Sequence, residues 1–186
     1  MDTFFEQIVA MKKSGKQIAA LVGIWIAAVI VLAALVMFLA PLGTFAFLLA
    51  VGAIWGAVWL SKRLNVEYEY IVTNGSLDVD KIVARSSRSR VLSCELSAVE
   101  RFEKFNPSAP PVGNYKKSVY ACNADDPNAC VLVVSEDGKG TRLLVFSPNE
   151  RLLKAVLKGL PKFIANSAYR DFNINPNPAF HGGDGE

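Results

Sequence analysis

The first third of the chain is dominated by one apolar stretch, in which no charged side chain occurs between Ile18 and Leu60. A helix rises about 1.5 Å per residue and the hydrocarbon core of a bilayer is about 30 Å thick, so the stretch is too long for one span and long enough for two. Pro41 and Gly43 interrupt it, because proline cannot continue a helix and glycine tolerates turn conformations. The pattern predicts a transmembrane helical hairpin over residues 18–60, with spans 18–40 and 42–60.

Basic residues flank this hairpin on both sides and none lies in its turn. Lys12, Lys13 and Lys16 precede the first span, and Lys62 and Arg63 follow the second. Lys and Arg near the ends of membrane spans are retained on the cytoplasmic side. The flanks therefore predict that both termini, and everything after the second span, lie in the cytoplasm.

Residues 1–17 precede the first span and are predicted to be helical. On a helix, the apolar side chains of residues 2–13 gather on one side, which is typical of an interfacial helix that lies along the lipid headgroups. A plain cytoplasmic extension of the first span fits the same residues, and the pattern leaves both interpretations open.

From Asn65 the pattern changes to a period of two, which is typical of strands. Residues 67–73 alternate, Asn74-Gly75 is the preferred two-residue turn of a hairpin, and residues 76–84 alternate again. Five further short strands follow from the same kind of pattern, at 88–96, 99–105, 118–123, 130–135 and 141–146.

The clearest helix start in the chain is Ser147-Pro148-Asn149-Glu150, which resembles a capping box with Ser147 as N-cap and proline at the first helical position. The helix that follows has an apolar stripe, and Pro161 ends or kinks it. Residues 166–186 lack periodicity and are predicted to be a flexible tail. The cations of the helix lie off the apolar stripe: Arg151, Lys154, Lys158 and Lys162.

Seven short strands followed by one amphipathic helix define the region 65–165. A small antiparallel sheet must hide its edges, and a helix with one apolar face can plug a rolled sheet. This order of elements resembles the pleckstrin-homology (PH) superfold, specifically bacterial PH-like domains. The predicted fold is a membrane α-helical hairpin followed by a mostly-β PH-like domain, with a seven-strand antiparallel sheet or partly open barrel and a C-terminal capping helix.

Three segments also resemble, in amino-acid sequence, an uncharacterised family of small bacterial two-span membrane proteins. They are the opening Met1–Phe4, the strand and turn Val66–Gly75, and the stretch Leu77–Ile82. The resemblance implies a two-span topology in a bacterial cell membrane, and it brings no catalytic or binding residues.

Little in the sequence indicates catalysis, a metal site or a cofactor. The one histidine, His181, lies in the predicted tail, where a precise geometry is hard to hold. Cys94, Cys122 and Cys130 are too few and wrongly spaced for structural zinc. Cys122 and Cys130 flank one loop; in a reducing cytoplasm they are expected to remain thiols, although the sequence leaves their pairing open. The net charge of +3 and the lack of a binding motif argue against nucleic acid.

Two sets of residues are candidates for contacts. One consists of small residues at four-residue spacing in the spans, which pack the spans together or join copies of the chain: Ala19, Gly23, Ala27, Gly52 and Gly56. The other consists of basic residues next to the membrane, which contact anionic headgroups or form an ordinary solvated face: Lys62, Arg63, Lys81, Arg85, Arg88 and Arg90.

These observations predict a non-enzymatic, membrane-anchored PH-like interaction module. Its expected partners are a protein segment, the anionic surface of the inner leaflet, or sister copies of the chain. The alternative is an accessory subunit of a larger membrane complex, such as a transporter or envelope-synthesis machinery, which contacts partner helices through its hairpin.

Overall fold

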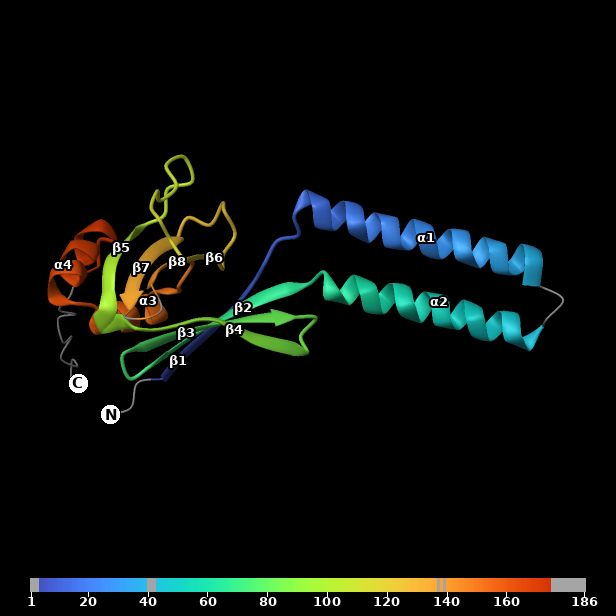
Figure 1. The fold of residues 1–186 in the computed structure, drawn as a ribbon, viewed down its shortest axis with the longest axis horizontal. Helices are drawn as coiled ribbons and strands as arrows, with labels where there is room; N and C mark the ends of the chain where they lie inside the picture. The colour runs from blue at the N-terminus through green and yellow to red at the C-terminus, as the bar shows by residue number, and fades with distance from the viewer. Residues whose placement is uncertain (1–3, 40–42, 137, 139, 175–186) are drawn as a thin grey trace, which may run out of the picture. The chain divides into compact units, whose positions relative to one another are not determined.

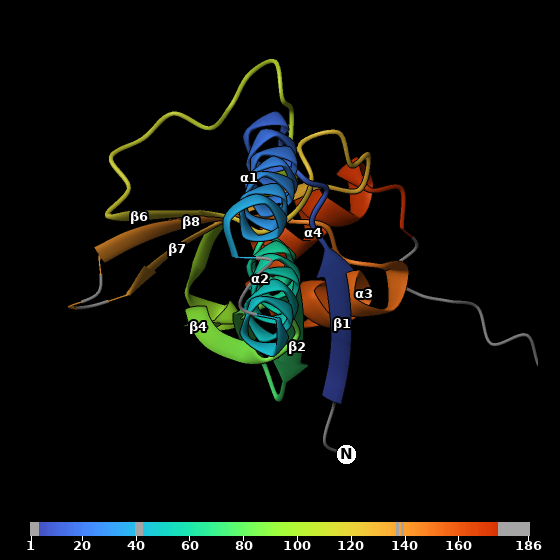
Figure 2. The same cartoon turned by 90° about the vertical axis from the view of Figure 1, so that its right-hand side faces the viewer.

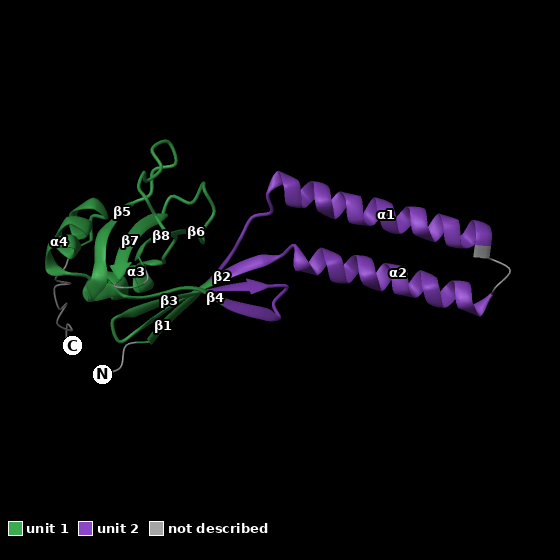
Figure 3. Ribbon diagram, in the orientation of Figure 1, with its two compact units in different colours: residues 1–7, 69–79, 90–186 green, residues 8–68, 80–89 purple. Residues whose placement is uncertain are grey.

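The structure is a computed structural model, which describes residues 4–39, 43–136, 138 and 140–174. The chain divides into two compact units (Figure 3). Unit 1 comprises Met1–Gln7, Glu69–Val79 and Arg90–Glu186, and unit 2 comprises Ile8–Tyr68 and Asp80–Ser89. Strands β1 to β4 each contribute residues to both units, and the two units are described separately below.

Two long helices make up most of unit 2: α1 (Gly15–Leu39) and α2 (Thr44–Arg63). They lie side by side in both views (Figures 1 and 2), and both are long and apolar enough to cross a membrane. The buried residues Ala28 and Ala57 are small, which lets the two backbones approach each other. The predicted turn at Pro41 lies outside the described residues, while Gly43 next to it has a φ of 53°.

In the part of the chain that the structure describes, eight strands form two sheets of four (Figure 1). The first sheet has the order β1-β2-β3-β4, and its strands are β1 (Phe4–Ala10), β2 (Val66–Thr73), β3 (Ser76–Val83) and β4 (Ser87–Glu95). The second has the order β5-β7-β8-β6, and its strands are β5 (Val99–Lys104), β6 (Lys117–Tyr120), β7 (Cys130–Glu136) and β8 (Gly140–Phe146).

Of the two predicted alternatives, a seven-strand antiparallel sheet or a partly open barrel, the single antiparallel sheet is therefore wrong in two respects. The strands are divided between two sheets, and β6 pairs with β8 in parallel, with Ser118 opposite Leu143. β6 and β7, which the connection 121–129 joins, are not neighbours in the sheet. β8 lies between them and pairs antiparallel with β7 and parallel with β6. The Asn74-Gly75 turn between β2 and β3 is confirmed, with φ of 47° and 89° at its two residues.

Phe4–Ala10 form a strand, so the helix predicted over residues 1–17 is wrong for these residues, whereas Gly15 and the residues after it are helical. Along β1, Phe5, Gln7 and Val9 are half-buried while the residues between them are exposed. This alternation fits a strand, and pairing with β2 provides partners for the backbone of β1. The apolar residues fall at positions 4, 5, 8 and 9, which is helical spacing, because the strand leaves Phe4 and Ile8 exposed.

The core of unit 1 is built around two aromatic side chains, Tyr70 of β2 and Phe146 of β8, which are both fully buried. Their rings meet edge to face with centroids 5.5 Å apart. The Tyr70 hydroxyl donates a hydrogen bond of 2.7 Å to the carbonyl oxygen of Ala121, just after β6. A strand of the first sheet is thereby bonded to a segment that follows a strand of the second sheet.

A polar seam joins β4 to the second sheet within unit 1. Arg142 on β8 donates to the carbonyl oxygen of Ser93 at 3.1 Å and pairs with Glu136 at 2.9 Å. Lys117 on β6 donates to the carbonyl oxygen of Val91 at 2.5 Å. Side chains thus satisfy backbone groups of the edge strand β4, which would otherwise be open to pairing with another chain.

Two helices, α3 (Glu150–Gly159) and α4 (Lys162–Asp171), follow β8. The N-cap of α3 is Asn149, whose side chain accepts from the amide of Leu152 at 2.9 Å, so the prediction of Ser147 as the cap is wrong. Ser147 instead follows β8 directly, and the Gln7 side chain donates to its carbonyl oxygen at 3.0 Å.

The predicted tail also begins too early, because α4 runs through Asp171. Pro161 ends the first helix and precedes the second. The buried residues of α4 are Ala165 and Ala168, which are too small to mark an apolar stripe in the sequence. Phe172 then packs on Phe102 of β5 with ring centroids 5.6 Å apart. Residues 175–186, including His181, lie outside the described residues.

Candidate functional site

Basic side chains of unit 2 gather where its two helices meet the strands. The amide of Met11 donates to the carbonyl oxygen of Val66 at 3.0 Å, and the amide of Ala84 donates to that of Asn65 at 3.0 Å. These bonds bring the start of α1, the end of α2 and the β3–β4 turn together. We call the cations of these segments the basic collar: Lys12, Lys13, Lys16, Lys62, Arg63, Lys81, Arg85 and Arg88.

The collar carries a strong excess of positive charge, since unit 2 contains only the carboxylates of Glu67 and Asp80. Glu67 pairs with Arg85 at 3.1 Å, and the Arg85 side chain remains 84% exposed. The Arg63 guanidinium lies over the Trp59 ring, 4.0 Å from its centroid, at the end of α2. Lys62, Arg63, Lys81, Arg85 and Arg88 of the predicted set are thus brought together in one unit.

Arg90, the sixth residue of the predicted set, belongs to unit 1 and is not part of the collar. Its guanidinium pairs with Asp78 on the neighbouring strand β3 at 2.7 Å. This cross-strand pair offsets the charge that the sequence analysis assigned to Arg90.

The small residues of the helices divide between two environments. Ala27 and Gly56 line a cavity of about 310 Å³ between α1 and α2. Ala19, Gly23 and Gly52 do not line this cavity and are exposed, as Ala27 also is. A Cβ added at Gly23, Gly52 or Gly56 meets nothing within 4 Å. Gly23 and Gly52, which lie outside the cavity, therefore leave open space that another helix can enter.

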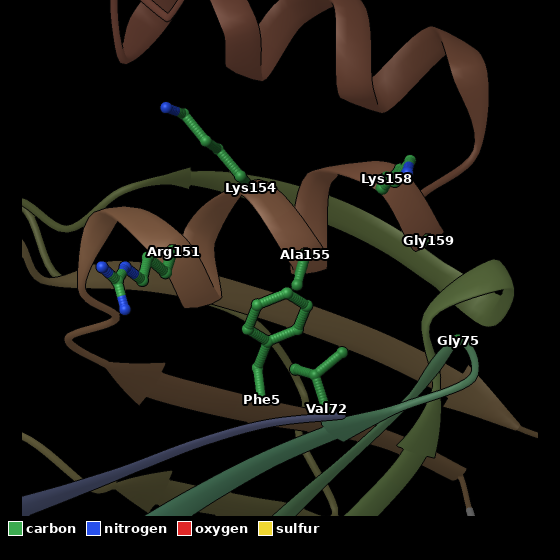
Figure 4. Close-up of a pocket in the computed structure, with 8 residues that line it drawn as sticks. All are labelled: Phe5, Val72, Gly75, Arg151, Lys154, Ala155, Lys158 and Gly159. Atoms are coloured by element: carbon green, nitrogen blue, oxygen red, sulfur yellow. The ribbon is translucent and has the colours of Figure 1, made fainter. Parts of the chain in front are cut away.

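Unit 1 contains a groove that the sequence analysis did not find (Figure 4). Its volume is about 390 Å³, and it lies between α3 on one side and β1, β2 and the β2–β3 turn on the other. Phe5 and Val72 form its apolar floor, Ala155 of α3 faces them, and Arg151, Lys154 and Lys158 of α3 line it with cations. The basic positions of α3 were visible in the sequence, but the wrong helical assignment for Phe5 hid the strand that completes the groove.

The three cysteines are buried free thiols. Burial raises the pKa of the Cys94 thiol to about 12 and that of Cys122 to about 11, and it also raises the pKa of Cys130. Thiols with such raised pKa values are poor nucleophiles and metal ligands at neutral pH. Within the part of the chain that the structure describes, no three His, Cys, Asp or Glu side chains gather as a metal site.

The architecture is that of a β-rich domain with C-terminal helices, in a chain that also carries two helices apolar enough to cross a membrane. A family model described as "Bacterial PH-like domain (DUF6106)" matches residues 1–165, and the chain belongs to this family. The resemblance predicted from the sequence is thereby confirmed. No curated protein and no solved structure matches the chain.

Proposed function

We propose that this protein is a non-enzymatic module anchored in the bacterial cell membrane by α1 and α2, with its basic collar against anionic lipid headgroups. Both termini and the PH-like domain lie on the cytoplasmic side. The observation that carries the proposal is the convergence of the unit 2 cations at one end of an apolar helix pair. PH-like domains are generally non-catalytic, which supports a role in binding.

The outer surface of the helix pair supports insertion in a membrane. Large apolar side chains remain exposed along both helices, among them Met37 (80% exposed) and Phe45 (69%). Contiguous apolar surface of this extent marks a membrane or protein contact, because exposing it to water is unfavourable. At about 1.5 Å per residue, α1 is about 37 Å long and α2 about 30 Å, against a hydrocarbon core of about 30 Å.

The charge distribution supports a cytoplasmic collar. Positive residues that flank spans are retained in the cytoplasm, and the collar lies next to the start of α1 and the end of α2. Near an anionic leaflet each Lys or Arg contributes about 1 kcal/mol, within a Debye length of about 8 Å at physiological salt. Glu67 offsets part of this contribution at Arg85.

The orientation is tested by treating intact spheroplasts with protease. We expect the region after α2 to resist cleavage until the membrane is opened with detergent. A tag placed after Glu186 reports cleavage, and a cytosolic enzyme reports leakage. Removal of the tag while the cytosolic enzyme stays intact would show that the collar faces outward, and the proposal would fail.

Headgroup contact is tested on the full chain in lipid nanodiscs by hydrogen–deuterium exchange of the β3–β4 turn. Exchange at residues 84–86 is expected to be slower in discs that contain phosphatidylglycerol than in discs of phosphatidylcholine alone. The triple variant Lys81→Gln/Arg85→Gln/Arg88→Gln should lose this difference. A matched variant in unit 1, Arg101→Gln/Lys104→Gln/Lys116→Gln, should keep it; equal exchange in both lipids for the native chain would refute headgroup contact.

The open space at Gly23 and Gly52 favours a second candidate function, in which the helix pair joins a larger membrane complex as an accessory subunit. In that case Gly23→Leu and Gly52→Leu remove partner proteins from a gentle-detergent pull-down. Val29→Leu, at an exposed position of α1, is the control. If the leucine variants recover the same partners as the native chain, these glycines do not contact another subunit.

A further inference from the structure

The groove of unit 1 combines an apolar floor with cations along one wall. Figure 4 shows Phe5, Val72 and Ala155 pointing toward one another from β1, β2 and α3. Val72 is buried, while Phe5 and Ala155 are half-buried and open to the groove. A volume of about 390 Å³ lies in the range of pockets that hold a small ligand or one large side chain with its neighbours.

Two of the groove cations are available to a ligand. Lys154 already pairs with Glu150 one turn earlier at 2.6 Å. Arg151 and Lys158 are exposed and form no ion pair with any residue that the structure describes. They stand on either side of the apolar floor in Figure 4. The groove thus offers one positive charge at each end and an apolar surface between them.

The spacing of these charges distinguishes between classes of ligand. Arg151 and Lys158 are separated by two turns of α3, or about 10.5 Å along its axis. The apolar residues of the groove lie between the two positions, so a ligand that covers them and also pairs with both cations needs two separated negative charges with an apolar group between them. An extended peptide advances about 3.3 Å per residue, so two acidic residues about three positions apart match the distance.

We propose that this groove binds an acidic segment of a partner protein. One apolar side chain of the segment packs on Phe5, Val72 and Ala155, and flanking carboxylates pair with Arg151 and Lys158. The apolar contact supplies affinity, and the two charge pairs set position and orientation. This site goes beyond the contact of the basic collar with lipid and uses a separate set of residues.

The test uses the full chain in phosphatidylcholine nanodiscs, where anionic lipid is absent, and measures the anisotropy of a labelled peptide. The probe is a Gly/Ser peptide in which one leucine lies between two glutamates about three residues apart. Two comparison peptides carry lysine in place of the glutamates or serine in place of the leucine. We expect the acidic leucine peptide to bind about tenfold more tightly than either comparison peptide.

Charge-reversed variants of the protein complement the comparison of peptides. Arg151→Glu/Lys158→Glu changes only exposed positions and should weaken the acidic peptide by about tenfold while strengthening the lysine peptide. Lys162→Glu, at an exposed position of α4, should change neither. Equal binding of the acidic and lysine peptides to the native chain, or unchanged binding to the reversed variant, overturns the proposal. If discs that contain phosphatidylglycerol displace the acidic peptide from the native chain, the groove binds lipid headgroups instead of a peptide, and the proposal also fails.

Discussion

The hydrogen bond between Tyr70 and Ala121 is the most informative single contact to remove. Both residues are fully buried, and the tyrosine hydroxyl donates to the Ala121 carbonyl oxygen at 2.7 Å. Tyr70→Phe keeps the ring and its edge-to-face contact with Phe146 but leaves that carbonyl oxygen without its donor. A buried acceptor without a partner costs about 1–3 kcal/mol, so we expect the free energy of unfolding to fall by about 2 kcal/mol.

This loss is measurable by pulse proteolysis of the full chain in nanodiscs across a urea series. With a urea dependence of about 2 kcal/mol per molar, typical of small domains, the unfolding midpoint should fall by about 1 M. Tyr68→Phe is the matched control, because Tyr68 lies two residues earlier on the same strand and is only half-buried. Its midpoint should stay within experimental error of the native value. If both variants show the same midpoint, the bond from Tyr70 to the segment after β6 does not stabilise the domain and the reasoning is refuted.

Three further changes test other parts of unit 1 by the same assay. Gly159→Ala should destabilise the domain by about 1–3 kcal/mol although alanine favours helices, because the new Cβ meets the Leu96 side chain at 2.6 Å. Asn149→Ala should cost about 1 kcal/mol, since it removes the acceptor for the Leu152 amide at the start of α3. Stability should also fall as pH rises above about 9, because the unfolded thiols ionise there while burial keeps the native ones protonated. The thiols concerned are Cys94, Cys122 and Cys130.

Each of these predictions has a counterpart that isolates its cause. Gly23→Ala should be tolerated, because the new Cβ meets nothing within 4 Å. Ser147→Ala should lower the free energy of unfolding by less than Asn149→Ala does. A larger loss for Ser147→Ala would show that Ser147 is the cap of α3. Replacing the three cysteines by alanine should remove the part of the alkaline loss that belongs to the thiols. If native and cysteine-free chains lose stability in parallel above pH 9, thiol burial does not cause it.

Elements defined by local pattern were predictable from the sequence. The absence of charge between Ile18 and Leu60 indicated two apolar helices, and Asn74-Gly75 indicated the β2–β3 hairpin, because both signals depend only on neighbouring residues. The N-cap of α3 was missed by two residues. Ser147 and Asn149 are both good caps, and the backbone path after β8, where Gln7 bonds to the Ser147 carbonyl oxygen, favours the second.

Features that depend on distant partners were not predictable. The N-terminal segment became a strand because β2, more than fifty residues later in the chain, provides its hydrogen bonds. The groove combines Phe5 of that strand with Arg151 and Lys158 of α3, so no local window contains it. The basic collar was predictable in part, because its residues all carry positive charge. That Arg90 pairs with Asp78 on the neighbouring strand was visible only in the structure.

The amino-acid sequence by itself determined the two apolar helices, the alternating strands and the amphipathic start of α3, because hydrophobic periodicity and turn residues act over a few positions. Only the tertiary structure decided that the strands divide between two sheets, that Tyr70 bonds to Ala121, and that the first strand and α3 enclose a groove. These outcomes depend on which surfaces exclude water together and which buried polar groups find partners. That choice is made among residues far apart in the chain.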